Sequence, residues 1–226
     1  MNTTEPLPCE LNLTPVEARV VGALIEKRIT TPELYPLTLN ALLAACNQKN
    51  NRHPVMDLDA QTVQNTVYSL QEKRLAVSFS GATSRVVKYR ECLADKLKLD
   101  EKETALICEL LLRGPQTVGE LKGRAARMTP FESLEETLAT LQRLTQPDPV
   151  PFVVELPRQP GRKESRFAHL LGDQPPVEEP PEATAAITYA APTPSRLETL
   201  ETRVVALEDE VAKLKELFAT FKSQFE

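Results

Sequence analysis

The sequence has no tryptophan, and only 5% of its 226 residues are aromatic. Stacking of successive single-stranded bases needs several exposed rings, so this kind of nucleic-acid binding is disfavoured. Glycine is also scarce, with seven residues, and no glycine-rich phosphate loop is present. The sequence also lacks G-x-S-x-G and H-E-x-x-H motifs. We therefore expect no enzymatic activity.

Cysteine and histidine are too few and too scattered to predict a metal site. The cysteines lie at positions 9, 46, 92 and 108 without a C-x-x-C pair, and His53 and His169 are not at ligand spacing from any of them. We expect no metal and no cofactor. Reduced, buried thiols in a cytosolic protein are the simplest interpretation.

Long apolar runs are absent as well. No stretch approaches the roughly 18 residues that a membrane-spanning helix needs. The N-terminus lacks the basic and then apolar pattern of a secretion signal. We therefore expect a cytoplasmic protein without a membrane partner.

The net charge of −5 hides an uneven distribution. Residues 14–171 contain 22 basic and 19 acidic side chains, whereas residues 172–226 contain 5 basic and 11 acidic ones. Residues 14–90 alone have 10 basic against 6 acidic side chains. The acidity is thus concentrated in the tail, and the N-terminal part is mildly basic.

Residues 14–92 predict a first winged-helix domain, in which a wing-like hairpin follows three helices. Thr14, Pro15 and Glu17 form a capping box with proline at the first helical position. Five elements are expected: a helix from 14 to before Pro32, helices over 37–46 and 60–74, and strands over 77–80 and 85–89. A further short strand is expected at Val55–Met56, after an asparagine-rich loop.

The same pattern returns 86 residues later, where Asp100 and Glu103 match Thr14 and Glu17. Continuing at this offset, Thr117 matches Thr31. The further signals are a helix capped by Thr117, a third helix striped by Phe131, Leu134, Leu138 and Leu141, and a hairpin over 152–156 and 165–170. Residues 95–171 therefore predict a second domain of the same kind.

The remaining segments differ in character from these two domains. Residues 1–13 predict a flexible leader, and residues 172–195, with six prolines, predict a linker. Residues 196–226 repeat apolar side chains in heptads, which predicts a coiled coil and a homodimer. Its expected contacts are Leu197, Leu200, Val204, Leu207, Val211, Leu214, Phe218 and Phe221. Parallel and antiparallel pairing both satisfy the charges, and a lone helix that folds back remains an alternative.

The predicted fold class is mainly α with small β-hairpins (α+β). It comprises two tandem winged-helix domains, a proline-rich linker and a C-terminal coiled coil. With these residues laid out, the chain resembles the YceH family of bacterial tandem winged-helix proteins, for which no function is established. The resemblance covers residues 14–171, with long shared strings such as TPELYPL at 31–37 and NRHPVM at 51–56. It implies two winged-helix domains and no activity.

In a helix-turn-helix, the third helix enters the major groove of DNA. Amide side chains on this helix can pair with adenine, and nearby lysines and arginines can contact phosphates. The candidate nucleic-acid contacts of the first domain are Gln61, Gln64, Asn65, Ser69, Arg85 and Lys88. Lys49 and Arg52 in the asparagine-rich loop are further candidates, although asparagine and glutamine side chains that complete the hydrogen bonds of a turn are the simpler interpretation of this loop.

The third helix of the second domain is acidic, with Glu132, Glu135 and Glu136, so this helix is poorly suited to phosphates. Positive charge lies instead on the second helix and the hairpin. The candidates there are Lys122, Arg124, Arg127, Arg158, Arg162, Lys163 and Arg166. A DNA contact led by the hairpin and a protein-binding domain are both consistent with this pattern.

Two functions follow from these patterns. The first is a dimeric protein that binds double-stranded DNA, with a regulatory role. The second is a non-enzymatic scaffold that recruits a protein partner through its winged helices and coil. This second arrangement resembles the tandem winged-helix subunit of bacterial condensin.

Overall fold

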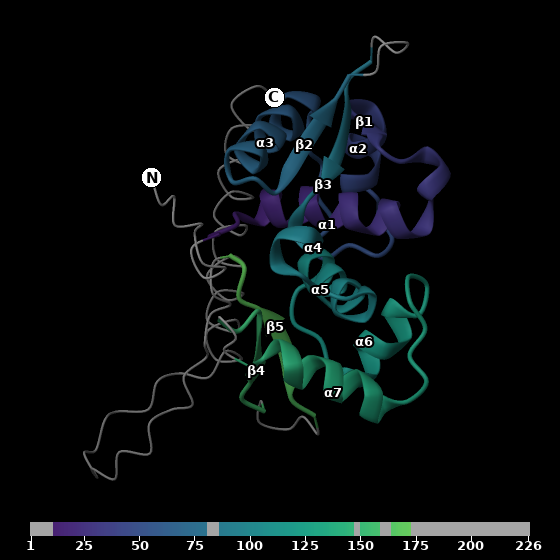
Figure 1. Cartoon of the computed structure of the whole chain (residues 1–226), viewed down its shortest axis with the longest axis vertical. Helices are drawn as coiled ribbons and strands as arrows, with labels where there is room; N and C mark the ends of the chain where they lie inside the picture. The colour runs from purple at the N-terminus through teal and green to yellow at the C-terminus, as the bar shows by residue number, and fades with distance from the viewer. Residues whose placement is uncertain (1–10, 81–85, 147–149, 159–163, 173–226) are drawn as a thin grey trace, which may run out of the picture. The chain divides into compact units, whose positions relative to one another are not determined.

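Two helices, α1 (Pro15–Thr30) and α5 (Glu101–Arg113), pack against each other at the centre of the structure (Figure 1). Both begin with a predicted capping box: Glu17 and Glu103 bond back to the N-caps Thr14 and Asp100. Residues 17–26 and 104–112 are buried without interruption. Each helix is enclosed because its own half of the chain covers one side and the other central helix covers another.

This computed structural model describes residues 11–80, 86–146, 150–158 and 164–172, which belong to one compact unit. Apart from Gly172, the predicted linker and coiled coil, with all eight predicted dimer contacts, lie outside the described residues, and so does most of the predicted leader. No helix in the described ranges is long and apolar enough to cross a membrane.

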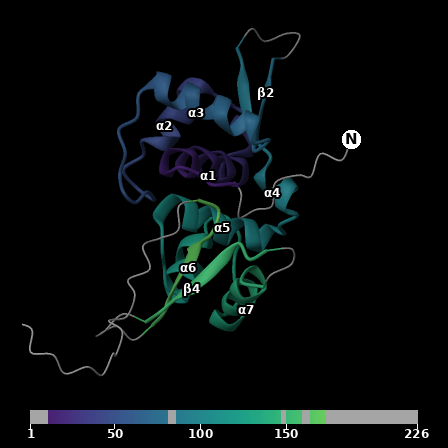
Figure 2. The same cartoon turned by 90° about the vertical axis from the view of Figure 1, so that its left-hand side faces the viewer.

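Residues 15–91, here called the first module, form the upper half in Figures 1 and 2. Its elements after α1 are the 3-10 turn η2 (Pro32–Leu34), β1 (Leu37–Thr38), α2 (Leu39–Cys46), α3 (Ala60–Glu72), β2 (Ala76–Phe79) and β3 (Lys88–Glu91). The three strands form an antiparallel sheet in the order β1-β3-β2. Tyr89 at its centre pairs with both Leu37 and Ser78.

Residues 101–169, here called the second module, repeat this order below α1. After α5 come α6 (Val118–Ala125), α7 (Leu134–Leu144), β4 (Val153–Leu156) and β5 (Arg166–His169). Gln116 forms an isolated bridge to Phe167 on β5, in the position that β1 occupies in the first module. The short helix α4 (Leu93–Leu97) connects the modules. The predicted α+β class is therefore confirmed.

The predicted register of the repeat is wrong beyond the central helices. Thr117 caps α6 and corresponds to Thr38, the N-cap of α2, rather than to Thr31. Thr31 instead ends α1, and the turn η2 adds chain between the helices of the first module. The fixed offset of 86 residues fails after the central helices, because the first module has the extra turn η2 before its second helix and the second module does not.

Two other local predictions also need correction. Val55 and Met56 form no strand. The loop is held by the side chain of Asn47, which donates to the Leu58 carbonyl at 2.8 Å and accepts from the Leu58 amide at 2.9 Å. These bonds from Asn47 hold the loop in place without any strand pairing by Val55 and Met56.

The last residues of the predicted leader belong to the folded unit. Leu11 and Leu13 are buried, and the Leu13 amide donates to the Leu171 carbonyl at 2.9 Å. Leu13 also bridges to Gly172. A Cβ at position 172 would lie 2.3 Å from the Leu13 oxygen, so only glycine permits this approach.

The two central helices approach closely at Gly22. A Cβ at this position would lie 3.0 Å from Leu112 Cδ2 and 3.3 Å from Leu111 Cβ. The Cys108 thiol donates to the Gly22 carbonyl across the same contact, at 3.3 Å. The missing side chain lets the backbones of α1 and α5 approach.

We predict that Gly22→Ala destabilises the protein by about 1–2 kcal/mol, because overpacking outweighs the gain in helix propensity. Gly123→Ala in α6, where a Cβ would meet nothing within 4 Å, is the matched control. It should stabilise the protein by about 0.5–1 kcal/mol. Urea unfolding of both variants measures the difference, and equal effects would contradict the proposed close contact.

Candidate functional site

The outward surface of α3 is polar and carries no charge before Glu72 at its C-terminal end. Its inward side buries Val63, Thr66, Val67 and Leu70. The exposed side presents Gln61, Asn65 and Tyr68, and Gln61 donates to Asn65 at 2.9 Å. The structure thus places two of the four predicted α3 contacts together in solvent.

The other two predicted α3 contacts are engaged within the protein. Gln64 is half-buried and accepts a hydrogen bond from the Tyr89 hydroxyl at 3.2 Å. Ser69 donates to Glu17 Oε1 at 2.7 Å, beside the Lys73–Glu17 ion pair. These contacts orient α3 on the sheet and on α1, so the two residues support the surface rather than extend it.

Positive charge lies on the strand beside α3. Lys88 is half-buried on β3, and the exposed Arg90 places its guanidinium 5.4 Å from the centre of the Phe79 ring. Lys49 is exposed in the loop after α2. Arg85 lies outside the described residues. The name α3 surface is used here for Gln61, Asn65 and Tyr68 on the helix together with Lys88 and Arg90 on the hairpin. Tyr89, between the two cations on β3, contacts Gln64 of α3, so Lys88 and Arg90 project from the other face of the strand.

The prediction that Arg52 contacts nucleic acid is wrong, because its side chain is buried. Its guanidinium forms two bonds with Glu26, at 3.1 and 2.5 Å, and donates twice to the Ala45 carbonyl. No surface of this group is left for a phosphate. Arg52 instead neutralises a buried carboxylate of α1.

Arg127, another predicted nucleic-acid contact, extends this buried charge cluster to the second module. Its guanidinium pairs with Glu26 of α1 and, at 2.6 Å, with Glu109 of α5. Arg113 lies 3.3 Å from the other oxygen of Glu109. The cluster, defined as Glu26, Arg52, Glu109, Arg113 and Arg127, joins the two modules and leaves Arg127 committed to carboxylates.

The electrostatics of the cluster favour ionised Glu26. Burial alone would raise the pKa of this carboxyl, but hydrogen bonds and charge from Arg52 and Arg127 outweigh burial and lower the pKa to about 2. The same contacts raise the pKa of Arg127, because Glu109 and Glu26 outweigh its own burial. The charges therefore persist at neutral pH.

The asparagine-rich loop docks on the second module. The His53 amide donates to the Leu112 carbonyl at 2.9 Å, and Arg113 donates to the Asn51 side chain. From α1, Arg19 donates to the Cys46 carbonyl at 3.1 Å and to the Pro54 carbonyl at 2.6 Å. The loop thus has a structural role in joining the modules, while Lys49 remains exposed.

The predicted cations of the second module are dispersed. Lys122 donates to the Glu132 carbonyl. Arg124 donates to the side-chain oxygen of Gln116 and forms an ion pair with Glu120. Arg166 donates to the Pro115 carbonyl and also forms an ion pair with Glu120. Arg158 is exposed, and Arg162 and Lys163 lie outside the described residues. The described residues of this hairpin do not assemble a positive surface.

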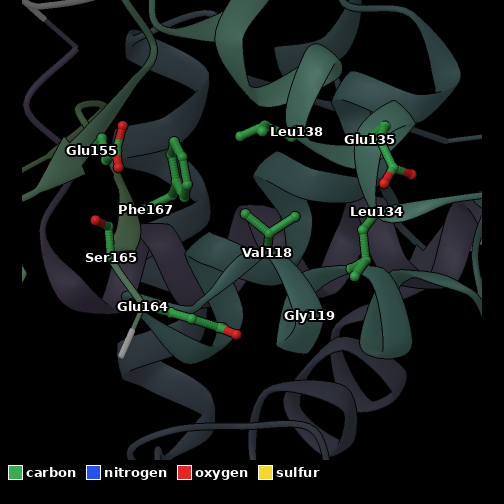
Figure 3. A pocket seen from close by; sticks show the side chains of 9 residues that line it. All are labelled: Val118, Gly119, Leu134, Glu135, Leu138, Glu155, Glu164, Ser165 and Phe167. Carbon is green, nitrogen blue, oxygen red and sulfur yellow. The ribbon is translucent and has the colours of Figure 1, made fainter. Parts of the chain in front are cut away.

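An apolar groove of about 330 Å³ lies between α7 and the β4–β5 hairpin of the second module (Figure 3). Val118, Leu134, Leu138 and Phe167 supply its apolar lining. Its other lining residues are Gly119, Glu135, Glu155, Glu164 and Ser165. Figure 3 shows Glu135 on the helix side and Glu155 and Glu164 on the hairpin side. Carboxylates therefore flank an apolar floor.

This groove corrects the predicted buried stripe of the third helix. The buried side of α7 consists of Thr137, Thr140, Leu141 and Leu144, whereas Leu134 is 50% exposed and Leu138 37% exposed. The threonines are accommodated because their hydroxyls donate to the carbonyls of Ser133 and Glu136, one turn earlier. The helix is thereby rotated, and two leucines are left at the groove.

Within the described residues, no group of three or more His, Cys, Asp or Glu side chains could hold a metal ion. The thiols of Cys46, Cys92 and Cys108 are free; Cys46 and Cys108 are buried, as predicted, whereas Cys92 is half-buried. Burial raises the pKa of Cys46 to about 12 and that of Cys108 well above its usual value, so these thiols stay protonated. Burial likewise lowers the pKa of His169 to about 4.

Comparison with known proteins gives a consistent result. A family described as "Protein of unknown function, DUF480" matches residues 13–162. A UPF0502 protein from Hahella chejuensis is 49% identical over 90% of this chain and 94% of its own length. A UPF0502 protein from Pelobacter propionicus is 49% identical, and the match covers 100% of its length. One from Aeromonas hydrophila is 45% identical, and the match covers 98% of its length. The predicted resemblance to an uncharacterised bacterial family is confirmed.

We predict that Glu26→Gln destabilises the protein at pH 7 by about 3 kcal/mol, because it leaves buried arginines without a full counter-charge. The pKa of Glu26 falls from 4.5 to about 2 on folding, so its contribution is complete above pH 4.5 and disappears as the pH falls towards 2.

Urea unfolding at pH 7, 4.5 and 3 measures this effect. The acid-induced loss of stability should be smaller in Glu26→Gln than in the unmodified protein. Glu33→Gln, an exposed change in η2, is the control and should follow the unmodified protein. Parallel pH curves for Glu26→Gln and the unmodified protein would contradict this role.

Proposed function

The chain belongs to the DUF480 family, whose description assigns no function, and we propose from its geometry that it binds double-stranded DNA through the first module. The observation behind this proposal is the α3 surface. It combines exposed amides on a helix with cations on the adjacent hairpin.

We infer that each module is a winged helix. The order of three helices followed by a hairpin, with a short strand or bridge before the second helix, supports this interpretation in both modules. In this fold the third helix enters the major groove. In the first module that helix is α3.

The chemistry of α3 suits a polyanionic duplex. No acidic residue occurs between Asp59, its N-cap, and Glu72. Gln61 and Asn65 can exchange their mutual bond for paired bonds to an adenine edge. Lys88 and Arg90 on β3 supply the sequence-independent attraction to phosphates.

We predict that a double Lys88→Glu and Arg90→Glu variant weakens binding to all duplexes alike, by about tenfold or more at low salt. The salt dependence of the affinity should also decrease, because fewer counterions are released. Gln61→Ala with Asn65→Ala should instead change the preference among sequences. Gel shifts over a salt series measure all three quantities.

The control is Arg143→Glu in the second module, a charge reversal at an exposed side chain distant in sequence from the α3 surface. It should leave duplex affinity unchanged. Absence of binding to any duplex by the unmodified chain at about 50 mM salt would refute the proposed function, since non-specific attraction is strong there.

A second function is favoured by the groove beside α7. In a winged helix this position would face DNA, yet it presents Leu134, Leu138 and Glu135. Exposed leucines rimmed by carboxylates are suited to a protein partner and unsuited to phosphates. We therefore propose that the second module docks a protein, so that the chain acts as a non-enzymatic adaptor.

The heptad pattern of residues 196–226 supports a homodimer as part of this proposal. We predict that a chain ending at Pro194 has half the mass of the full chain in light scattering. The folded unit should persist in both, as judged by its thermal unfolding. An unchanged mass would place the dimer contact elsewhere.

A further inference from the structure

The exposed leucines of α7 belong to a shaped surface. Leu134 and Leu138 are one helical turn apart, and both line the groove with Val118 and Phe167 (Figure 3). Phe167 is only 2% exposed and is held by backbone bonds to Gln116 in both directions. The floor is thus fixed by the fold, while the two leucines form one wall.

The rim of the groove is acidic in its described part. Glu135, Glu155 and Glu164 line it, and the described lining residues include no lysine or arginine. A hydrogen bond from Ser133 is the main cause of the lowered pKa of Glu135, which keeps this carboxylate ionised at neutral pH. The nearby Arg166 is occupied by Glu120 and the Pro115 carbonyl.

We propose that this groove binds a basic segment of a partner protein, one that inserts two or three large apolar side chains and flanks them with lysine or arginine. This inference rests on the proposed docking function of the second module and specifies its partner. The volume of about 330 Å³ accommodates a few side chains rather than a whole domain surface. The carboxylates on both sides select the charge of the flanking residues.

Charge complementarity also distinguishes this partner from other occupants. Residues 172–226 of the same chain contain 11 acidic and 5 basic side chains, so they would meet the acidic rim with net repulsion. A nucleic-acid backbone would meet the same repulsion. A basic, apolar segment of another protein satisfies both the floor and the rim.

The test uses a library of random peptides displayed on phage and selected on the full chain. A variant with Leu134→Asp and Leu138→Asp serves for counter-selection. Both changes are at exposed positions, and thermal unfolding checks that the variant is folded. Enriched peptides should be net basic and contain at least two large apolar residues. Enrichment of acidic peptides, or equal enrichment on the double variant, would overturn the proposal.

Affinity of a synthetic enriched peptide is then measured by fluorescence anisotropy. The leucine double variant and a Glu135→Lys, Glu155→Lys variant should each lose about tenfold or more, and the second loss should shrink at high salt. The matched controls are Leu34→Asp, at a 65% exposed leucine of η2, and Glu101→Lys at the start of α5. Both controls should bind as the unmodified chain does.

Two further measurements separate this proposal from the others. Gel shifts with duplex DNA on the leucine double variant report the first module independently. If no peptide is enriched on the unmodified chain while its duplex binding is intact, the groove proposal alone is refuted. Light scattering on the same variant detects a second copy as occupant. A drop in mass caused by the leucine changes would assign the groove to self-association and overturn the basic partner.

Discussion

Two carboxylates are buried where the modules meet, and their neutralisation constrains how the two halves can be arranged. Glu26 from α1 and Glu109 from α5 share Arg127, while Arg52 and Arg113 complete the counter-charge. An unpaired buried charge costs several kcal/mol, so any packing of the modules that leaves Glu26 or Glu109 without a partner is strongly disfavoured. The apolar contact at Gly22 brings the helices close enough for this pairing. Apolar packing therefore brings α1 and α5 together, and the ion pairs favour one arrangement of the two modules.

The two modules share their internal plan but differ on their outward surfaces. In both, a central helix, a capped second helix and a hairpin support a third helix. On α3 the outward residues are amides, whereas on α7 they are leucines and a glutamate. The supporting residues differ accordingly: Gln64 and Ser69 hold α3 through side-chain bonds, and buried threonines set the rotation of α7. A duplicated fold thus presents two outward surfaces of different chemistry.

Local signals in the sequence predicted the helices, caps and hairpins well, because capping boxes and turn residues act within a few positions. Thr14 with Glu17 and Asp100 with Glu103 are examples. The candidate site was less predictable. Arg52 looked like a surface cation because its partners, Glu26 and Ala45, are distant in sequence or hidden in the backbone. The burial of Thr137 and Thr140 was not predicted, because a hydrophobic pattern does not reveal hydroxyl groups that bond to preceding carbonyls. Burial that depends on such partners cannot be predicted from local sequence patterns and is seen only in the structure.

The contact between Leu13 and Gly172 brings the two limits of the described unit together. The polypeptide path of this unit therefore begins and finishes at one place on its surface, as in folds that tolerate circular permutation. Any domain, tag or tether fused at either side would leave from the same place. Attachments made at these two limits of the described unit would then compete for the same space, whereas new termini opened within an exposed loop would be independent of it.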